Sequence, residues 1–162
     1  MKKKIKITVW SYLEEYKSLR SSIIKHVDKV FKSGTLILGK EVKNLEKNFS
    51  SFTKNKYGVG VNSGTDALQI ILMSLNIGKG DEVITTSNTA VPTVSAIVSC
   101  NAKPVFVDIN EQDYLIDVKK IEKKISKRTK AIIPINLYGQ CANYKKLKKI
   151  AKKYKIHIIE DC

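Results

Sequence analysis

Arginine is nearly absent from this sequence, although the chain is strongly basic. The 162 residues carry a formal net charge of +15, and because Arg20 and Arg128 are the only arginines among 30 basic residues, lysine supplies 28 of them. A surface that grips nucleic-acid phosphates favours arginine, whose planar guanidinium binds phosphate through two hydrogen bonds. The composition therefore argues against a nucleic-acid binder, a function that would show steeply salt-dependent binding to RNA or DNA.

Cysteine and histidine are scarce as well. The three cysteines, Cys100, Cys141 and Cys162, form no CxxC pair and are odd in number, which favours reduced thiols over a disulfide framework. His26 and His157 are the only histidines, so the sequence predicts no zinc site and no other metal centre.

Long apolar runs are also missing. No eighteen consecutive residues are apolar, so the sequence predicts no transmembrane helix. The start MKKKIKITVW is positively charged, but the apolar stretch after it is too short and too interrupted for a signal peptide. With 43% apolar residues, the composition is that of a globular protein. We expect a cytoplasmic protein without a membrane partner.

The densest lysine run, NYKKLKKIAKKYK, has the pattern of an amphipathic helix. Leu147, Ile150, Ala151 and Tyr154 form one apolar stripe, and the lysines cover the remaining surface. This pattern predicts a solvated face rather than a binding surface.

The pattern of the chain changes near residue 56. Before that point apolar residues recur every three or four positions, which predicts two amphipathic helices around the loop KSGTLILGKE. After it, short strands and helices alternate, with turn signals such as GKGD between them. We expect strands at 57–61, 82–86, 104–107, 131–135 and 156–159, and helices at 64–75, 90–100, 118–125 (capped by Asp117) and 144–153.

This alternation predicts an α/β fold with a mainly parallel sheet. Helices would cover the sheet, and a ligand site would lie at the carboxyl ends of the strands. The last expected strand has no helix after it to cover the sheet, so we expect the chain to be part of a larger domain.

The strongest local signal is YGVGVNSGTDALQIIL, in which a predicted strand runs into an apolar helix. Free N–H groups and the positive end of the helix dipole would form an anion site there. Gly64 would let the backbone approach a ligand, and the Thr65 hydroxyl could donate a hydrogen bond. The alternative is a capping box in which Ser63 caps the helix and Asp66 follows three residues later. The two interpretations are compatible.

Neither a Walker A sequence nor a GxGxxG fingerprint is present, which argues against a nucleoside triphosphate or a dinucleotide as the ligand.

Asp161 is expected at the carboxyl end of a central strand. A buried carboxylate there needs a cationic or donor partner, and a protonated pyridine nitrogen is one such partner, because the ion pair would keep the ring electron-poor. The alternative is that Asp161 only caps the next helix or turn. Glu160 points to the opposite side of the strand and is expected to be structural.

Two loops bring further polar residues to the same edge. The loop after the second expected strand contains Asn88, Thr89 and the small residue Ala90. The loop after the fourth contains Asn136, Tyr138 and Gln140. Each signal is weak alone, but several that converge on one edge favour a ligand site.

An ordered set of segments resembles the DegT-type (DegT/DnrJ/StrS) sugar aminotransferases, which are fold-type I enzymes that use pyridoxal 5′-phosphate. The segments are LILGKEVKNLEKNF, YGVGVNSGTDAL, GKGDEVITTSNTAVPTVSAI, KPVFVDI, RTKAIIPINLYGQCAN and IHIIEDC. The resemblance extends over nearly the whole chain from about residue 10. It implies the N-terminal part of the large domain, a three-layer α/β/α structure with a mainly parallel sheet.

The resemblance also implies roles for particular residues. The segment matching Gly64, Thr65 and Asp66 holds the cofactor phosphate, and the aspartate matching Asp161 pairs with the pyridinium nitrogen. Ala90 stands where many members place an aromatic residue over the cofactor ring, so a smaller packing contact is expected here.

A complete protein of this kind would transfer an amino group, expected to come from glutamate, to a keto-deoxy sugar nucleotide in amino-sugar and polysaccharide biosynthesis. Asn88, Tyr138 and Gln140 are the expected substrate contacts. The resemblance implies a homodimer. It assigns residues 1–55 to N-terminal helices and a loop and residues 56–162 to βα units, without the C-terminal small domain.

The Schiff-base lysine of the family lies beyond the aspartate that matches Asp161, and the sequence stops one residue later. We therefore expect no catalytic residue in this chain, which alone would be inactive. The alternative function is a non-catalytic truncated fragment or remnant of such an enzyme.

Overall fold

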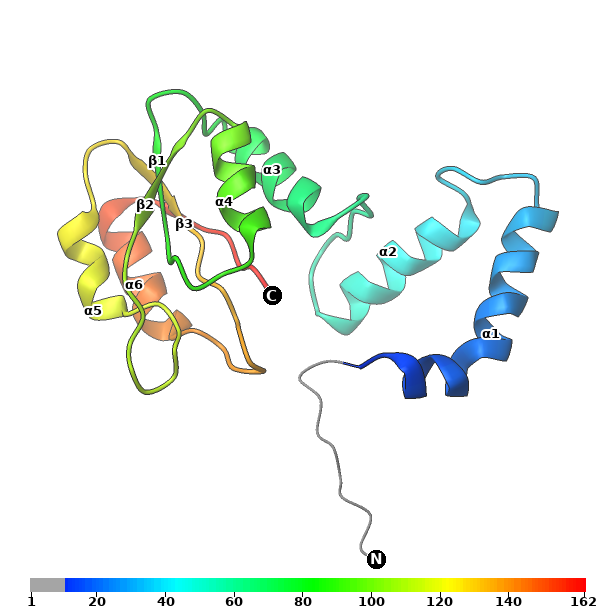
Figure 1. Cartoon of the computed structure of the whole chain (residues 1–162). Coiled ribbons are helices and arrows are strands. Elements are labelled where there is room, and N and C mark those ends of the chain that lie inside the picture. Colours follow the sequence, from blue (N-terminus) through cyan, green and yellow to red (C-terminus); the bar gives the residue numbers. More distant parts are fainter. Residues whose placement is uncertain (1–10) are drawn as a thin grey trace, which may run out of the picture. The chain divides into compact units, whose positions relative to one another are not determined.

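The computed structural model describes residues 11–162 of the chain (Figure 1). These residues fall into two compact units that divide between Gly60 and Val61. The domain assignment made from the sequence stays a prediction.

The first unit contains the two predicted amphipathic helices, α1 (Leu13–Lys32) and α2 (Lys40–Phe52). An exposed ion pair joins the two helices, with Lys29 Nζ of α1 at 2.8 Å from Glu41 Oε1 of α2; such pairs contribute little to stability. Neither helix has a buried side chain among the residues that the structure describes. Their apolar faces therefore remain available for packing.

The predicted strand at 57–61 was wrong, because this segment packs along α2 without joining the sheet. A Cβ atom at Gly58 would lie 2.6 Å from the Glu46 carbonyl oxygen, so only glycine allows this approach. The Gly60 N–H donates to Glu46 Oε1 at 2.9 Å. The alternation of glycine and apolar residues in YGVGV thus reflects close contact with a helix.

The second unit contains a parallel four-stranded sheet, which confirms the predicted fold class. Its strands are β1 (Glu82–Thr85), β2 (Lys103–Phe106), β3 (Thr129–Ile132) and β4 (His157–Ile158), in the order β2-β1-β3-β4. The three pairings between these strands are all parallel. In the sheet formed by residues 11–162, β4 lies at the edge and not at the centre that the sequence predicted for the strand before Asp161.

The four helices predicted for this unit are present. They are α3 (Gly64–Ser74), α4 (Val91–Ser99), α5 (Val118–Ile121), which continues as a 3-10 turn to Lys124, and α6 (Tyr144–Tyr154). The predicted cap of α5 is confirmed, because the Asp117 carboxylate accepts a hydrogen bond from the Lys119 N–H at 3.0 Å.

Apolar residues on both faces of the sheet form two cores, one under each pair of helices (Figure 1). Val83 and Ala131 face α3 and α4, whereas their neighbours Ile84 and Ile132 face α5 and α6. This alternation follows from the two-residue period of a strand. It produces the three α/β/α layers that the sequence predicts.

The lysine-rich helix α6 is arranged as predicted. Leu147 and Ile150 are buried against the sheet, whereas the lysines between and beyond them are exposed. The lysine run is therefore a solvated surface of the second unit.

Glu82 lies at the amino end of β1 and is buried, with 5% of its surface exposed. Its carboxylate accepts a hydrogen bond from Ser126 Oγ at 2.6 Å and another from the Arg128 guanidinium at 2.9 Å. The Ser126 hydroxyl and the Arg128 charge hold the pKa of Glu82 below its ordinary value of 4.5, against the opposing effect of burial.

Glu82 should therefore make the fold sensitive to acid. A lowered folded-state pKa adds stability above the unfolded-state value near 4.5, and that stability is lost as the pH falls through the folded-state pKa. The free energy of unfolding of the wild type should fall more steeply below pH 4.5 than that of Glu82→Gln. Urea unfolding between pH 7 and about pH 3 measures this difference. Glu14→Gln, which alters an exposed ion pair with Lys17, should keep the wild-type slope; parallel slopes in all three proteins would contradict the assignment.

Candidate functional site

The beginnings of two helices lie at the carboxyl edge of the sheet. α3 precedes β1 and α4 follows it, so both helices run opposite to the parallel strands and start at this edge. They pack against each other on one face of the sheet (Figure 1). In open α/β sheets this edge is where ligands bind.

The first turn of α3 leaves hydrogen-bond donors free. Ser63 caps the helix, because its Oγ accepts from the Asp66 N–H at 3.1 Å, and it also donates to Asp66 Oδ2 at 2.8 Å. The predicted cap is confirmed, although the Asp66 carboxylate binds the serine hydroxyl and not its backbone N–H. Within residues 11–162, the N–H groups of Gly64 and Thr65 and the Thr65 hydroxyl have no partner.

The start of α3 fits a phosphate group. A Cβ atom placed on Gly64 would meet nothing within 4 Å, so the space beside this residue is open. Free N–H groups at the positive end of a helix attract an anion, and Thr65 adds a hydroxyl donor. The assignment of Gly64, Thr65 and Asp66 to a cofactor phosphate stays a prediction.

Asp161 follows β4 and is fixed through its backbone to the segment that follows β3. Its N–H donates to the Pro134 carbonyl at 3.2 Å, and its own carbonyl accepts from the Asn136 N–H at 2.8 Å. The half-buried side chain accepts a hydrogen bond on Oδ2 from Thr93 Oγ1 at 2.6 Å. Oδ1 has no partner among the residues described. One carboxylate oxygen is therefore held in place and the other is available, which fits a ring nitrogen that carries a proton.

Sequence reasoning missed Thr93, the residue that holds this carboxylate. Thr93 lies in the first turn of α4 and is 2% exposed. Its Oγ1 lies 2.8 Å from Oγ1 of Thr89, which precedes the helix and is four residues earlier. The spacing of the two threonines is a signal in the sequence, but their partner Asp161 lies 68 positions away from Thr93.

Asn136, whose N–H binds the Asp161 carbonyl, also forms hydrogen bonds through its side chain. Its side-chain Nδ2 donates to Glu160 Oε1 at 2.8 Å, and its Oδ1 accepts from the Ala142 N–H at 3.0 Å and the Tyr144 hydroxyl at 3.3 Å. Burial, with the nearby Glu160 carboxylate, raises the pKa of Tyr144, so this hydroxyl stays protonated and donates. Glu160 thus has a structural contact, as expected.

Ala90 occupies the N-cap position of α4, and its side chain makes no capping hydrogen bond. It is exposed and directly precedes the helix that carries Thr93. Its methyl group is therefore accessible at the carboxyl edge, and its contact with a cofactor ring stays a prediction.

The side-chain amides of Asn88 and Gln140 hold the loop that follows β2. Asn88 Nδ2 donates to the Tyr114 carbonyl at 2.9 Å, and Gln140 Nε2 lies 3.5 Å from the Asp113 carbonyl. These donors are occupied by the protein, whereas the two amide oxygens have no partner among residues 11–162. A substrate contact by Asn88 or Gln140 stays a prediction, with the amide oxygens as the available atoms.

Tyr138 is presented on a tight turn. Tyr138 and Gly139 have φ values of 59° and 72°, and the Gln140 N–H closes the turn on the Leu137 carbonyl at 3.1 Å. The Tyr138 side chain is 69% exposed. It is accessible to a substrate, and this role also stays a prediction.

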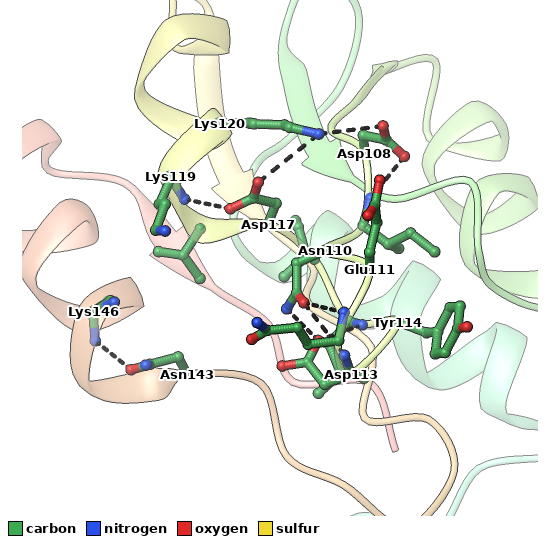
Figure 2. A pocket seen from close by; sticks show the side chains of 15 residues that line it. Asp108, Asn110, Glu111, Asp113, Tyr114, Asp117, Lys119, Lys120, Asn143 and Lys146 are labelled. Carbon is green, nitrogen blue, oxygen red and sulfur yellow. Dashed lines mark hydrogen bonds and ion pairs between the residues drawn. The ribbon is translucent and has the colours of Figure 1, made fainter.

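A pocket of about 730 Å³ lies beside the β2–α5 loop and the start of α6, and none of the predicted binding residues lines it (Figure 2). Figure 2 shows Asp108 and Asp117 turned toward Lys120. Four carboxylates and three lysines contribute to the lining: Asp108, Glu111, Asp113, Asp117, Lys119, Lys120 and Lys146. This mixture of charges does not favour a phosphate, and the pocket is distinct from the candidate phosphate site because none of that site's residues lines it.

The described residues show few other reactive groups. No cluster of three or more metal-binding side chains occurs in residues 11–162, and none of the helices in that range is long and apolar enough to cross a membrane. Burial raises the pKa of the Cys100 thiol, which disfavours its reactive thiolate form.

Comparison with known proteins decides the family. Residues 17–162 match the model of the DegT/DnrJ/EryC1/StrS aminotransferase family. The chain belongs to this family. Over 95% of its length it is 46% identical to dTDP-3-amino-3,4,6-trideoxy-alpha-D-glucose transaminase of Micromonospora megalomicea subsp. nigra, of which it covers 41%.

Solved structures of similar proteins have the same fold. DesV of S. venezuelae, in complex with a ketimine intermediate, matches 93% of this chain with a TM-score of 0.90 and 37% identity, and 41% of that chain is covered. The Bacillus subtilis protein ntda with bound cofactor PMP matches 99% of this chain with a TM-score of 0.89 and 32% identity. The match covers 38% of the ntda chain. The predicted fold of the fold-type I aminotransferases is confirmed. The chain spans about two fifths of the length of these relatives.

Proposed function

We propose that this chain supplies the cofactor-holding part of a pyridoxal 5′-phosphate-dependent aminotransferase. A protein of this family that contains it would transfer an amino group from glutamate to a keto-deoxy sugar nucleotide, in amino-sugar and polysaccharide biosynthesis. The observation that carries the proposal is the Asp161 carboxylate, held by Thr93 at one oxygen, at the same sheet edge as the free donors of α3. Relatives named as transaminases of dTDP- and UDP-linked sugars support the substrate class.

In this proposal, the chain binds the two ends of the cofactor. The N–H groups of Gly64 and Thr65 and the Thr65 hydroxyl donate to the phosphate, while Asp66 secures the Ser63 cap beside them. The free oxygen of Asp161 would accept a hydrogen bond from the N–H of the protonated ring, and its negative charge would favour that protonated form. When bound, the cofactor supplies an electron-withdrawing ring through which the amino group is transferred.

Three exposed or partly exposed side chains are proposed to face the sugar substrate. The amide oxygens of Asn88 and Gln140 would accept hydrogen bonds from hydroxyl groups, and the exposed Tyr138 ring would pack against the sugar. Ala90 would make a small apolar contact with the cofactor ring in place of aromatic stacking.

The proposed partners follow from the same reasoning. We propose a homodimer, which the unburied apolar side chains of α1 and α2 support because such faces need a packing partner. We also propose a cytoplasmic location and no role for nucleic acid.

Binding of pyridoxamine 5′-phosphate to the chain tests this proposal. Its amine does not condense with lysine, so the many lysines do not obscure the result. Saturable binding that is at least about tenfold tighter than that of pyridoxamine, which lacks the phosphate, is expected, because several charge-assisted hydrogen bonds are lost. Equal affinity for both compounds, or no binding, would contradict the proposal.

A second function, a non-catalytic fragment, is favoured by the position of the lysines. Every lysine in residues 11–162 is exposed, whereas a lysine that attacks a carbonyl group at neutral pH needs desolvation or a nearby cation to lower its pKa. We propose that no lysine of this chain anchors the cofactor covalently.

Borohydride reduction after incubation with pyridoxal 5′-phosphate should therefore label many lysines weakly and none stoichiometrically. Peptide mapping by mass spectrometry measures the labelling at each lysine, and a sample incubated with pyridoxal provides the background. A single lysine that is labelled stoichiometrically and only by the phosphorylated compound would defeat this proposal.

A further inference from the structure

We infer that Thr89 and Thr93 form a directional hydroxyl relay that orients Asp161 for the ring nitrogen of a pyridine cofactor. This inference rests on the proposed function and adds two positioning residues to it. Neither threonine needs to touch the cofactor, because both act through the carboxylate.

The direction of the relay follows from the donors available. An ionised carboxylate only accepts hydrogen bonds, so the Thr93 hydroxyl donates its single proton to Asp161 Oδ2 across 2.6 Å. Thr93 Oγ1 can then only accept from Thr89, whose Oγ1 lies 2.8 Å away. The chain of donors therefore runs from Thr89 through Thr93 to the carboxylate.

The position of Thr93 makes this contact strong and rigid. Thr93 is 2% exposed, and a hydrogen bond to a charged acceptor is stronger where water is excluded. It lies in the first turn of α4, so the positive end of the helix dipole also favours a negative charge there. Pro92 lies beside it in the same turn and fixes the backbone.

The relay also gives the two oxygens of the Asp161 carboxylate different roles. Oδ2 is occupied by Thr93, while Oδ1 has no partner within the described part of the chain. With the backbone of Asp161 held by Pro134 and Asn136, the free oxygen has a defined direction. Such preorganisation strengthens binding because less freedom is lost when the ligand arrives.

A comparison of two ligands separates positioning from a merely structural role. The probes are pyridoxamine 5′-phosphate and its 1-deaza analogue, in which carbon replaces the ring nitrogen. Thr93→Val keeps the shape of the side chain and removes the hydroxyl. It should weaken binding of pyridoxamine 5′-phosphate about tenfold, the effect of losing an oriented charged hydrogen bond, and leave binding of the deaza analogue within about twofold. Thr93→Ser, which keeps the hydroxyl, should restore the wild-type preference. Equal weakening of both ligands would overturn the inference.

A double-mutant cycle tests the relay without any ligand. Unfolding of the wild type, Thr93→Val, Asp161→Ala and the double variant should show coupling of at least about threefold in the unfolding equilibrium constant, because the two side chains are in contact. Additive effects would overturn the relay. If the wild type binds neither ligand, the proposed function fails and the ligand-orienting role fails with it, whereas the cycle still decides whether Thr93 and Asp161 are coupled through their hydrogen bond.

Discussion

Asp161→Asn should weaken the binding of pyridoxamine 5′-phosphate by about 10- to 100-fold, because a hydrogen bond to a charged group contributes about 1.5–3 kcal/mol. Asparagine has nearly the same shape as aspartate, and its amide oxygen can still accept the hydrogen bond from Thr93. It carries no negative charge, so it cannot form an ion pair with the protonated ring nitrogen. Isothermal titration of both proteins at neutral pH measures the change in dissociation constant.

Asp108→Asn provides the matched control for Asp161→Asn. Asp108 is an exposed carboxylate that pairs with Lys120 at 3.3 Å and lines the pocket beside the β2–α5 loop, which contains none of the predicted binding residues. The control removes the same charge and should leave the dissociation constant within about twofold of the wild type. A loss of similar size in both variants, or none in Asp161→Asn, would mean that Asp161 does not contact the ring.

Leu72→Ala should lower the free energy of unfolding of the chain by about 2–5 kcal/mol. Leu72 is 0% exposed and joins α3 to the core on one face of the sheet. Its truncation removes buried apolar surface and leaves a cavity that the surrounding side chains fill only in part. Since α3 begins at the candidate phosphate site, this core also positions the donors of Gly64 and Thr65. Urea unfolding measures the change.

Met73→Ala is the control on the same helix. The Met73 side chain is 60% exposed, and alanine has a high helix propensity. The free energy of unfolding should therefore change by no more than about 0.5 kcal/mol. Equal losses in Leu72→Ala and Met73→Ala would show that α3 does not depend on its buried face.

The sequence predicted most helices and strands because each has a clear apolar period. In α6, Leu147 and Ile150 recur at helical spacing between lysines, and both are buried. The cap residues Ser63 and Asp117 were also predictable, since capping depends on neighbours within the same turn. Each of these features is local in the sequence.

The sequence could not predict contacts that depend on distant segments. The alternation at 57–61 resembles that of a strand, but the close approach of Gly58 to Glu46 places the segment against a helix. Nothing near Asn88 indicates that its amide holds the Tyr114 carbonyl. The contact between Thr93 and Asp161 likewise exists only because α4 begins beside the end of β4. The sequence therefore predicted where the polar residues of the candidate site lie in the fold, but not which residues they contact.

The most direct test of the central claim is an NMR titration of the ¹⁵N-labelled chain with pyridoxamine 5′-phosphate. If the chain holds both ends of the cofactor, the largest shifts of the amide signals should occur at Gly64, Thr65 and Asp161 and at their immediate neighbours. These residues come from the start of α3 and the end of β4, so a joint response requires one ligand that reaches both. Shifts confined to the lysines of α6, or no shifts with saturating ligand, would contradict the account.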